Sequence, residues 1–198
     1  MSDTALIIFI KNPELGKVKT RIAKDSDDAT ALSIYHRLLK HTQQICDQLD
    51  MTRYLYYGEY IQSDHWSEEN YIKKVQKGLD LGERMLDAFI EVLSYHRNAI
   101  IIGSDCIYLT SDHIKNSADA LTHHDKVIGP TYDGGYYLLG MSQVQLDLFI
   151  NIPWSSGKEF ETTQKRVLQS GSSLYELPKL NDIDHLKDWE DYLISNPS

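Results

Sequence analysis

The sequence has few cysteines, few positive charges for its acids and no long apolar run. Its 198 residues include only two cysteines, Cys46 and Cys106, in unrelated contexts that match no zinc or redox spacing. Twenty lysines and arginines against 29 aspartates and glutamates give a formal net charge of -9, which disfavours DNA or RNA polymers as partners. No stretch has membrane-spanning length, and the first apolar run is too short for a secretory signal. We therefore expect a cytoplasmic protein without membrane insertion.

Two common nucleotide-binding signatures are also missing. The chain has no Gly-x-x-x-x-Gly-Lys-Ser/Thr loop and no Gly-x-Gly-x-x-Gly fingerprint. Their absence argues against a P-loop kinase and against a dinucleotide-dependent dehydrogenase.

Strand-like and helix-like segments alternate along the chain, which has the composition of one globular domain over residues 1–198. Buried strands are expected at 4–11, 53–58, 98–103, 126–131 and 173–178. Helices are expected at 27–49, 81–96, 110–121, 143–150, 158–169 and 183–193. The Asp-Gly turn before "YYLLGM" adds an antiparallel strand. This order predicts an α/β fold, a mostly parallel mixed sheet between two layers of helices.

A cluster of positive charge follows the first strand, in the segment from Lys11 to Lys24. It holds Lys11, Lys17, Lys19, Arg21 and Lys24 against the single acid Glu14. A loop between a strand and a helix of an α/β sheet is a common place for phosphate binding. We favour phosphate binding, and a solvated basic turn is the alternative.

The apolar run "III" at 100–102 ends on Gly103, Ser104 and Asp105. Because ligands bind outside the carboxyl ends of strands in open α/β sheets, Asp105 is a candidate site residue. The side chain of Ser104 or Asp105 could equally cap a turn by accepting hydrogen bonds from nearby backbone N–H groups. Both interpretations stay open.

Three further loops contain candidates that ordinary turns and caps also explain. Gly78 and Arg84 precede or open a helix, Asp133, Gly134 and Gly135 suit a hairpin turn, and Asp182, Asp184 and His185 precede the last helix. Hard cations such as Mg²⁺ take one or two carboxylates and fill the remaining positions with substrate phosphates. Asp105 with one late acid would therefore suffice for a metal site.

Five segments together resemble the nucleotide-diphospho-sugar transferase superfamily of GT-A type, in particular small bacterial glycosyltransferases described as arsenosugar-biosynthesis or selenodomain-associated. The segments are "FIKNPELGKVKTRI", "QKGLDLGERMLDAF", "IIIGSDCIYL", "GPTYDGGYYLLG" and "LPKLNDIDHLKDW", in family order over residues 9–189. The resemblance implies a Rossmann-like three-layer sandwich that binds a nucleotide-sugar and Mg²⁺ or Mn²⁺. Ile107, where the family commonly has proline, and His185, where threonine is usual, depart from the pattern.

The candidate site residues fall into four groups. Nucleotide contacts are expected from Lys11, Gly16, Lys17, Lys19, Arg21, Gly78, Arg84 and Ser104. Metal ligands are expected at Asp105 and Asp184, the acceptor side at Gly134 and Gly135, and catalytic roles at Asp133, Arg21 and Lys17.

The resulting hypothesis is a metal-dependent transfer of sugar to an unknown small acceptor. Lys17 and Arg21 would neutralise charge on the departing nucleotide, and Asp133 would serve as base, with Asp184 or His185 as less favoured choices. A nucleotidyltransferase releasing pyrophosphate and a catalytically inactive nucleotide-binding domain are the alternatives. The sequence leaves the base, the sugar, the acceptor and the oligomeric state open.

Overall fold

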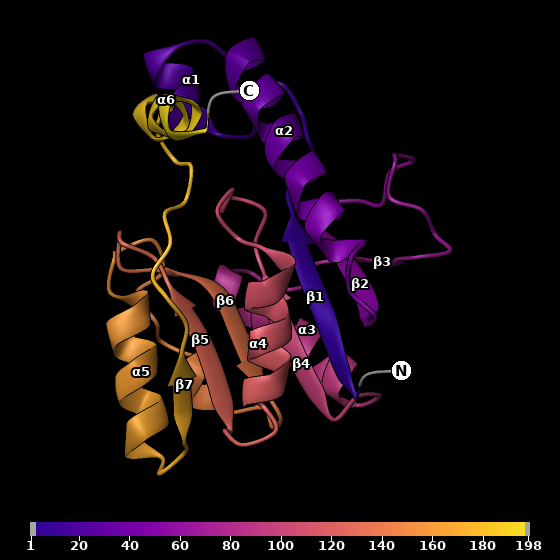
Figure 1. Ribbon diagram of the computed structural model, residues 1–198, viewed down its shortest axis with the longest axis vertical. Coiled ribbons are helices and arrows are strands. Elements are labelled where there is room, and N and C mark those ends of the chain that lie inside the picture. The colour runs from indigo at the N-terminus through magenta and orange to yellow at the C-terminus, as the bar shows by residue number, and fades with distance from the viewer. Residues whose placement is uncertain (1–2, 197–198) are drawn as a thin grey trace.

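A seven-stranded β-sheet runs through the computed structural model, which describes residues 3–196 (Figure 1). Its strands are β1 (Thr4–Ile10), β2 (Thr52–Tyr57), β3 (Ile72–Val75), β4 (Asn98–Ile102), β5 (Lys126–Pro130), β6 (Tyr136–Met141) and β7 (Leu174–Glu176). Their order in space is β3-β2-β1-β4-β6-β5-β7, and only the pairs that involve β6 are antiparallel. The ends of the expected domain, residues 1, 2, 197 and 198, lie outside the described residues.

Helices cover both faces of this sheet. They are α1 (Thr20–Asp25), α2 (Asp28–Cys46), α3 (Leu81–Leu93), α4 (Ser111–Ala120), α5 (Glu159–Gln169) and α6 (Leu186–Ser195), with a 3₁₀ turn, η1, at Leu146–Leu148. The longer ones begin at side-chain caps: Asp27 accepts the N–H of Thr30, and Asp80 that of Glu83. None of the helices in the described part of the chain has the length and apolar composition needed to cross a bilayer.

The alternation of side chains along the strands creates two hydrophobic cores, one on each face. Leu6, Ile8 and Ile10 of β1 pack with α1, α2, α4 and α6, whereas Ala5 and Ile7 pack with α3 and α5. The expected three-layer α/β/α architecture with a mostly parallel mixed sheet is therefore confirmed.

The expected element list differs from the structure in several details. Helix α1 was not predicted, because its six residues are too few to show a periodic apolar pattern. Strand β3 was not predicted, because its sequence "IKKV" is an edge strand with exposed or half-buried side chains. The helix expected at 143–150 is wrong, since only η1 forms there and Asn151 turns the chain with a positive φ of 54°. Helix α6 begins at Leu186 rather than 183, because the backbone N–H of Ile183 donates to the carbonyl of Asp105, 2.9 Å away.

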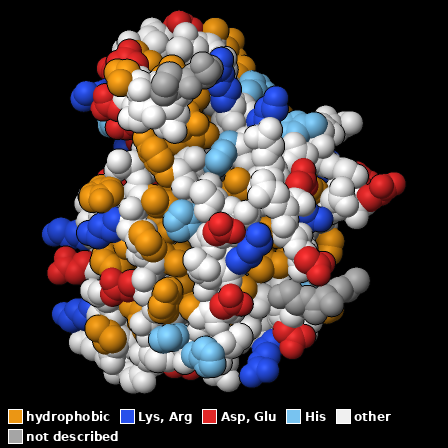
Figure 2. All heavy atoms as spheres, in the orientation of Figure 1, with side chains coloured by type: hydrophobic (Ala, Val, Ile, Leu, Met, Phe, Trp, Pro, Cys, Tyr) orange, Lys and Arg blue, Asp and Glu red, His pale blue; other side chains and the backbone are white. Residues whose placement is uncertain are grey.

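The segment 178–185, here called the C-terminal strap, crosses from β7 to α6 (Figure 1). It joins the sheet through Leu180, whose N–H donates to the carbonyl of Pro130 and whose carbonyl accepts the N–H of Tyr132. Helix α6 then packs beside α1. In the space-filling view, α1, α2 and α6 form a lobe above a narrower neck that the strap spans (Figure 2). The strap thus brings the end of the chain back to the loop after β1.

The turn between β5 and β6 packs tightly against the loop before α5. Gly134 has a φ of +93°, and a Cβ there would lie 2.0 Å from the carbonyl oxygen of Gly157. Gly171 also has a positive φ, +78°, but nothing lies within 4 Å of a Cβ built on it. Alanine substitutions at the two positions therefore distinguish the free-energy cost of backbone strain from that of a steric clash.

We predict that Gly134→Ala lowers the free energy of unfolding by about 3 kcal/mol, because strain and a backbone clash add. Gly171→Ala, the matched control with strain alone, should cost about 1 kcal/mol. Urea denaturation of both variants measures the difference, and equal losses would contradict the close packing of Gly134 on Gly157.

Candidate functional site

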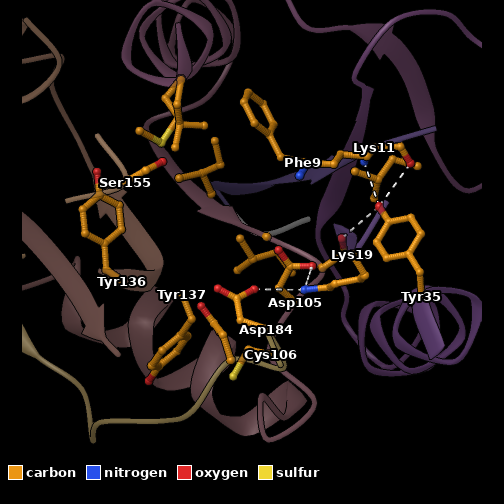
Figure 3. Close-up of a pocket in the computed structure, with 18 of the residues that line it drawn as sticks. Phe9, Lys11, Lys19, Tyr35, Asp105, Cys106, Tyr136, Tyr137, Ser155 and Asp184 are labelled. Carbon is orange, nitrogen blue, oxygen red and sulfur yellow. Dashed lines mark hydrogen bonds and ion pairs between the residues drawn. The ribbon is translucent and has the colours of Figure 1, made fainter. Parts of the chain in front are cut away.

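A cavity of about 460 Å³ opens where the carboxyl ends of β1 and β4 meet the start of β6 (Figure 3). The parallel register that aligns Ile8 with Ile102 sets Lys11 and Ser104 at the same edge of the sheet. One part of the wall is charged and carries Lys11, Lys17, Lys19, Arg21, Asp105, Asp182 and Asp184. The other part is mainly apolar and carries Phe9, Leu81, Met85, Ile101 and Leu139. Such a divided wall suits a ligand with an anionic group and a flat or apolar group.

Lys19 lies at the centre of the charged part (Figure 3). Its Nζ is 2.7 Å from Oδ1 of Asp105 and 3.3 Å from Oδ1 of Asp184, and its side chain is only 6% exposed. Arg21 contacts the other oxygen of Asp184 at 3.0 Å. The basic loop and the acid that ends β4 therefore converge on one cavity, as the sequence-based hypothesis requires.

Burial and charge act in opposite directions on this cluster. Burial would raise the pKa of Asp105, but the neighbouring ammonium of Lys19 outweighs it and holds that pKa below its ordinary value. Burial would likewise lower the pKa of Lys19, yet Asp105 and Asp184 raise it. These two groups are thus a charged pair.

Asp182 is the acid without a counter-ion in this cluster. Its Oδ1 is buried and has no hydrogen-bond partner. Burial, followed by the negative charge of Asp105, raises the pKa of Asp182 to about 7. At neutral pH this acid is therefore only partly ionised, and its buried oxygen has no partner within the described residues.

The hydroxyl of Tyr35 ties the loop after β1 to the end of β4 (Figure 3). It accepts the backbone N–H of Lys11 at 2.8 Å, lies 3.1 Å from the Lys11 carbonyl, and contacts Oγ of Ser104 at 3.3 Å. Burial raises the pKa of Tyr35 far above its ordinary value, so the hydroxyl stays neutral. Tyr35 is a positioning residue for the basic loop.

The C-terminal strap is anchored at the same edge of the sheet. Besides the bond from Ile183 to Asp105, the thiol of Cys106 donates to the carbonyl of Asn181 at 3.4 Å. Burial raises the pKa of Cys106 well above its ordinary range, so this thiol is a neutral packing group. These backbone anchors fix Asp182 and Asp184 at the cavity.

The cavity brings together about half of the predicted site residues. Lys11, Lys17, Lys19, Arg21, Ser104, Asp105 and Asp184 line it. Gly16, Gly78, Arg84, Asp133, Gly134 and Gly135 do not line it. Lys17 pairs with Glu14 at 2.6 Å at the exposed rim.

The residues outside the cavity have local structural partners. Asp133 accepts hydrogen bonds from the hydroxyl of Thr131 and the N–H of Gly135, the pattern of a side-chain-stabilised turn. Arg84 donates to the carbonyl of Gly78 at 3.2 Å, within the loop that precedes α3. Their predicted functional roles stay predictions.

Sequence reasoning missed several residues of the cavity. Tyr35 lies within the helix expected at 27–49 and was not named as a site residue, and Asp182 was considered only as an acid near the last helix. Gln76, Tyr136 and Ser155 also line the cavity, and no local pattern marks the first two. Ser155 carries the one usable signal, because "WSSGK" contains a turn-forming Ser-Gly, and its φ is 60°.

The carboxylates of Asp105 and Asp184 are oxygen ligands of the kind that divalent cations such as Mg²⁺ bind. No three His, Cys, Asp or Glu side chains within residues 3–196 are arranged to hold a metal ion. However, Asp105 and Asp184 each direct one oxygen at a single positive charge, and the orphaned oxygen of Asp182 lies buried nearby. Two carboxylates are sufficient where substrate phosphates complete the ligand set.

The fold confirms the resemblance of the sequence to the nucleotide-diphospho-sugar transferase superfamily. The crystal structure of a "putative nucleotide-diphospho-sugar transferase" from Desulfovibrio desulfuricans G20 matches with a TM-score of 0.90 and 27% identity, covering 100% of this chain and 89% of that one. A family model described as "Uncharacterized protein conserved in bacteria (DUF2064)" matches residues 41–156. The chain belongs to this DUF2064 family. No curated protein matches it.

More distant structures share the fold alone. CMP:2-keto-3-deoxy-manno-octonic acid synthetase complexed with CTP has a TM-score of 0.58 at 9% identity, covering 98% of this chain and 99% of that one. Rv0371c from Mycobacterium tuberculosis H37Rv, in complex with manganese, has a TM-score of 0.58 at 12% identity, covering 97% and 98%. These two structures therefore support the fold of this chain and nothing finer.

We predict that Tyr35→Phe lowers the free energy of unfolding by about 1–2 kcal/mol, because it leaves the part-buried N–H of Lys11 without its acceptor. It should also weaken nucleotide binding, since the basic loop loses its anchor. Tyr175→Phe on the edge strand β7 is the control and should change neither. Chemical denaturation and a nucleotide thermal-shift assay measure both effects; unchanged stability in Tyr35→Phe would refute the anchoring role.

Proposed function

We propose that this chain is a metal-dependent transferase that takes a nucleotide-diphospho-sugar as donor and passes the sugar to a small acceptor. The observation that carries the proposal is the convergence of Lys19 and Arg21 with Asp105 and Asp184 in one cavity at the carboxyl ends of the strands. The name of the Desulfovibrio structure, at 27% identity over the whole chain, supports the donor class. The cytoplasmic location expected from the sequence is part of this proposal.

The cations of the basic loop would bind and stabilise the diphosphate. Lys11, Lys17, Lys19 and Arg21 line the same wall, and fixed positive charge acts most strongly on charge that grows on a leaving group. The bond between the sugar carbon and the diphosphate breaks, the nucleoside diphosphate leaves, and the acceptor oxygen bonds to that carbon as its proton passes to a base. Tyr35 would keep the loop in place during this exchange.

Asp105 and Asp184 would hold Mg²⁺ or Mn²⁺ in this proposal. When bound, the ion supplies additional positive charge against the diphosphate. The Rv0371c structure is a complex with manganese and shares the fold. Asp133 stays the predicted base, although its turn lies outside the cavity wall.

Transfer of a nucleotidyl group is the second candidate. The synthetase complexed with CTP has the same fold, which supports this chemistry as well. In that reaction the sugar or another acceptor attacks the α-phosphorus of a nucleoside triphosphate and pyrophosphate leaves. The basic loop would serve either substrate.

We expect Asp105→Asn to reduce metal-dependent nucleotide binding and turnover roughly 100-fold or more, because it removes a charge that positions both the ion and Lys19. Asp119→Asn, an exposed acid of α4, is the control. Calorimetric titration of nucleoside diphosphates with and without Mn²⁺, alongside a thermal-unfolding check, makes the measurement. Retention of both activities in Asp105→Asn would refute the site assignment.

Product analysis separates the two candidate reactions. With a nucleotide-sugar donor and a pool of small acceptors, we expect release of nucleoside diphosphate and no pyrophosphate. A thermal-shift screen of uridine, guanosine, cytidine and adenosine diphosphates and their sugars would first identify the base. Release of pyrophosphate from nucleoside triphosphates, with no diphosphate from any nucleotide-sugar, would replace glycosyl transfer by nucleotidyl transfer.

A further inference from the structure

Lys19 occupies the position between the two acids that the proposed function assigns to a divalent cation. Its Nζ contacts one oxygen of Asp105 and one oxygen of Asp184, and the side chain is almost fully buried. An ammonium and a divalent ion cannot occupy the same place between these oxygens. The lysine is therefore a built-in competitor for the metal.

We propose that Lys19 acts as an exchangeable internal counter-ion, so that the metal site opens only when a nucleotide diphosphate gives the ammonium a new anionic partner. This inference rests on the proposed function, and it concerns the order in which the two ligands bind. Metal alone must displace a cation that already neutralises the site. When a diphosphate is also present, the ammonium of Lys19 can move to the diphosphate, and the metal can then bind the freed carboxylates.

The backbone on both sides supports such an exchange. Asp105 and the strap are joined by the 2.9 Å hydrogen bond from Ile183, which does not involve Lys19. The acids can therefore keep their places when the lysine side chain moves. Lys19 itself has a φ of 46° and a ψ of 44°, a left-handed conformation that a lysine rarely adopts.

The surrounding charges favour the same exchange. Without a ligand, Asp105, Asp182 and Asp184 face Lys19, Arg21 and the nearby Lys11, and the site is nearly neutral. A diphosphate adds negative charge beside the lysines, which creates room for a divalent cation at the carboxylates. Binding of the two ligands should then be positively coupled, and the coupling is reciprocal.

The test is the affinity for Mn²⁺ alone and with each of the four nucleoside diphosphates, measured by calorimetry and by loss of the free Mn²⁺ signal in electron paramagnetic resonance. Lys19→Met keeps the length of the side chain and removes the charge. We expect it to bind Mn²⁺ alone at least tenfold more tightly than the wild type. Its nucleotide-dependent gain in affinity should largely disappear. Lys165→Met, an exposed lysine of α5 outside the cavity, controls for the change in net charge and should behave as wild type.

A Lys19→Met variant that binds Mn²⁺ alone no more tightly than the wild type would overturn the inference while leaving the proposed function intact. A wild type that binds none of the nucleotides would defeat the proposed function and, with it, the nucleotide-dependent exchange, even if Lys19→Met binds Mn²⁺ alone more tightly. If Lys19→Met does not fold, Lys19→Gln, an uncharged hydrogen-bond donor, carries the same expectation. Thermal unfolding of each variant precedes the titrations.

Discussion

The ion cluster of Lys19 with Asp105 and Asp184 holds together three segments that are far apart in the sequence. It links the loop after β1, the end of β4 and the C-terminal strap at one edge of the sheet. Acids gathered at a partly buried edge would repel one another without a cation, and a buried charge without a partner is strongly destabilising. The ion cluster therefore links the same segments that the hydrogen bond from Ile183 to Asp105 also holds together, and it lies inside the cavity. A ligand that competes for Lys19 acts on the stability of the strap as well as on the site.

The antiparallel strand β6 makes this arrangement possible. The strands β1 and β4 are parallel, so their carboxyl ends lie together, and β6 runs the other way and contributes its amino end to the same edge. The strap then follows β5 along Pro130 and Tyr132 before it reaches Asp105. A fully parallel sheet would need a crossover helix in place of the short turn at Asp133. That turn leaves the edge open on the side where the strap passes.

The sequence predicted what depends on local pattern and missed what depends on distant contact. Buried strands, capped helices and the reversal of charge at Lys11–Lys24 are properties of neighbouring residues, and the structure confirms these strands and the convergence on Asp105. The contact of Tyr35 with Ser104 joins residues 69 positions apart, so no local pattern within the helix expected at 27–49 could reveal it. At the two departures from the family pattern, Ile107 is buried in the core and the backbone N–H of His185 donates to Asp188 at the start of α6.

A basic loop in an acidic protein is by itself weak evidence for an anionic ligand, because the acids of the chain can neutralise it. Here they do so in part: Lys17 pairs with Glu14, and Lys19 and Arg21 pair with the cavity acids. Buried ion pairs add little to stability once desolvation is counted, so stability alone does not explain a lysine held in a left-handed conformation. The buried oxygen of Asp182 that lacks a hydrogen-bond partner also raises the free energy of the unliganded protein. The left-handed backbone of Lys19 and the unpartnered oxygen of Asp182 are both consistent with a cavity that binds a charged substrate.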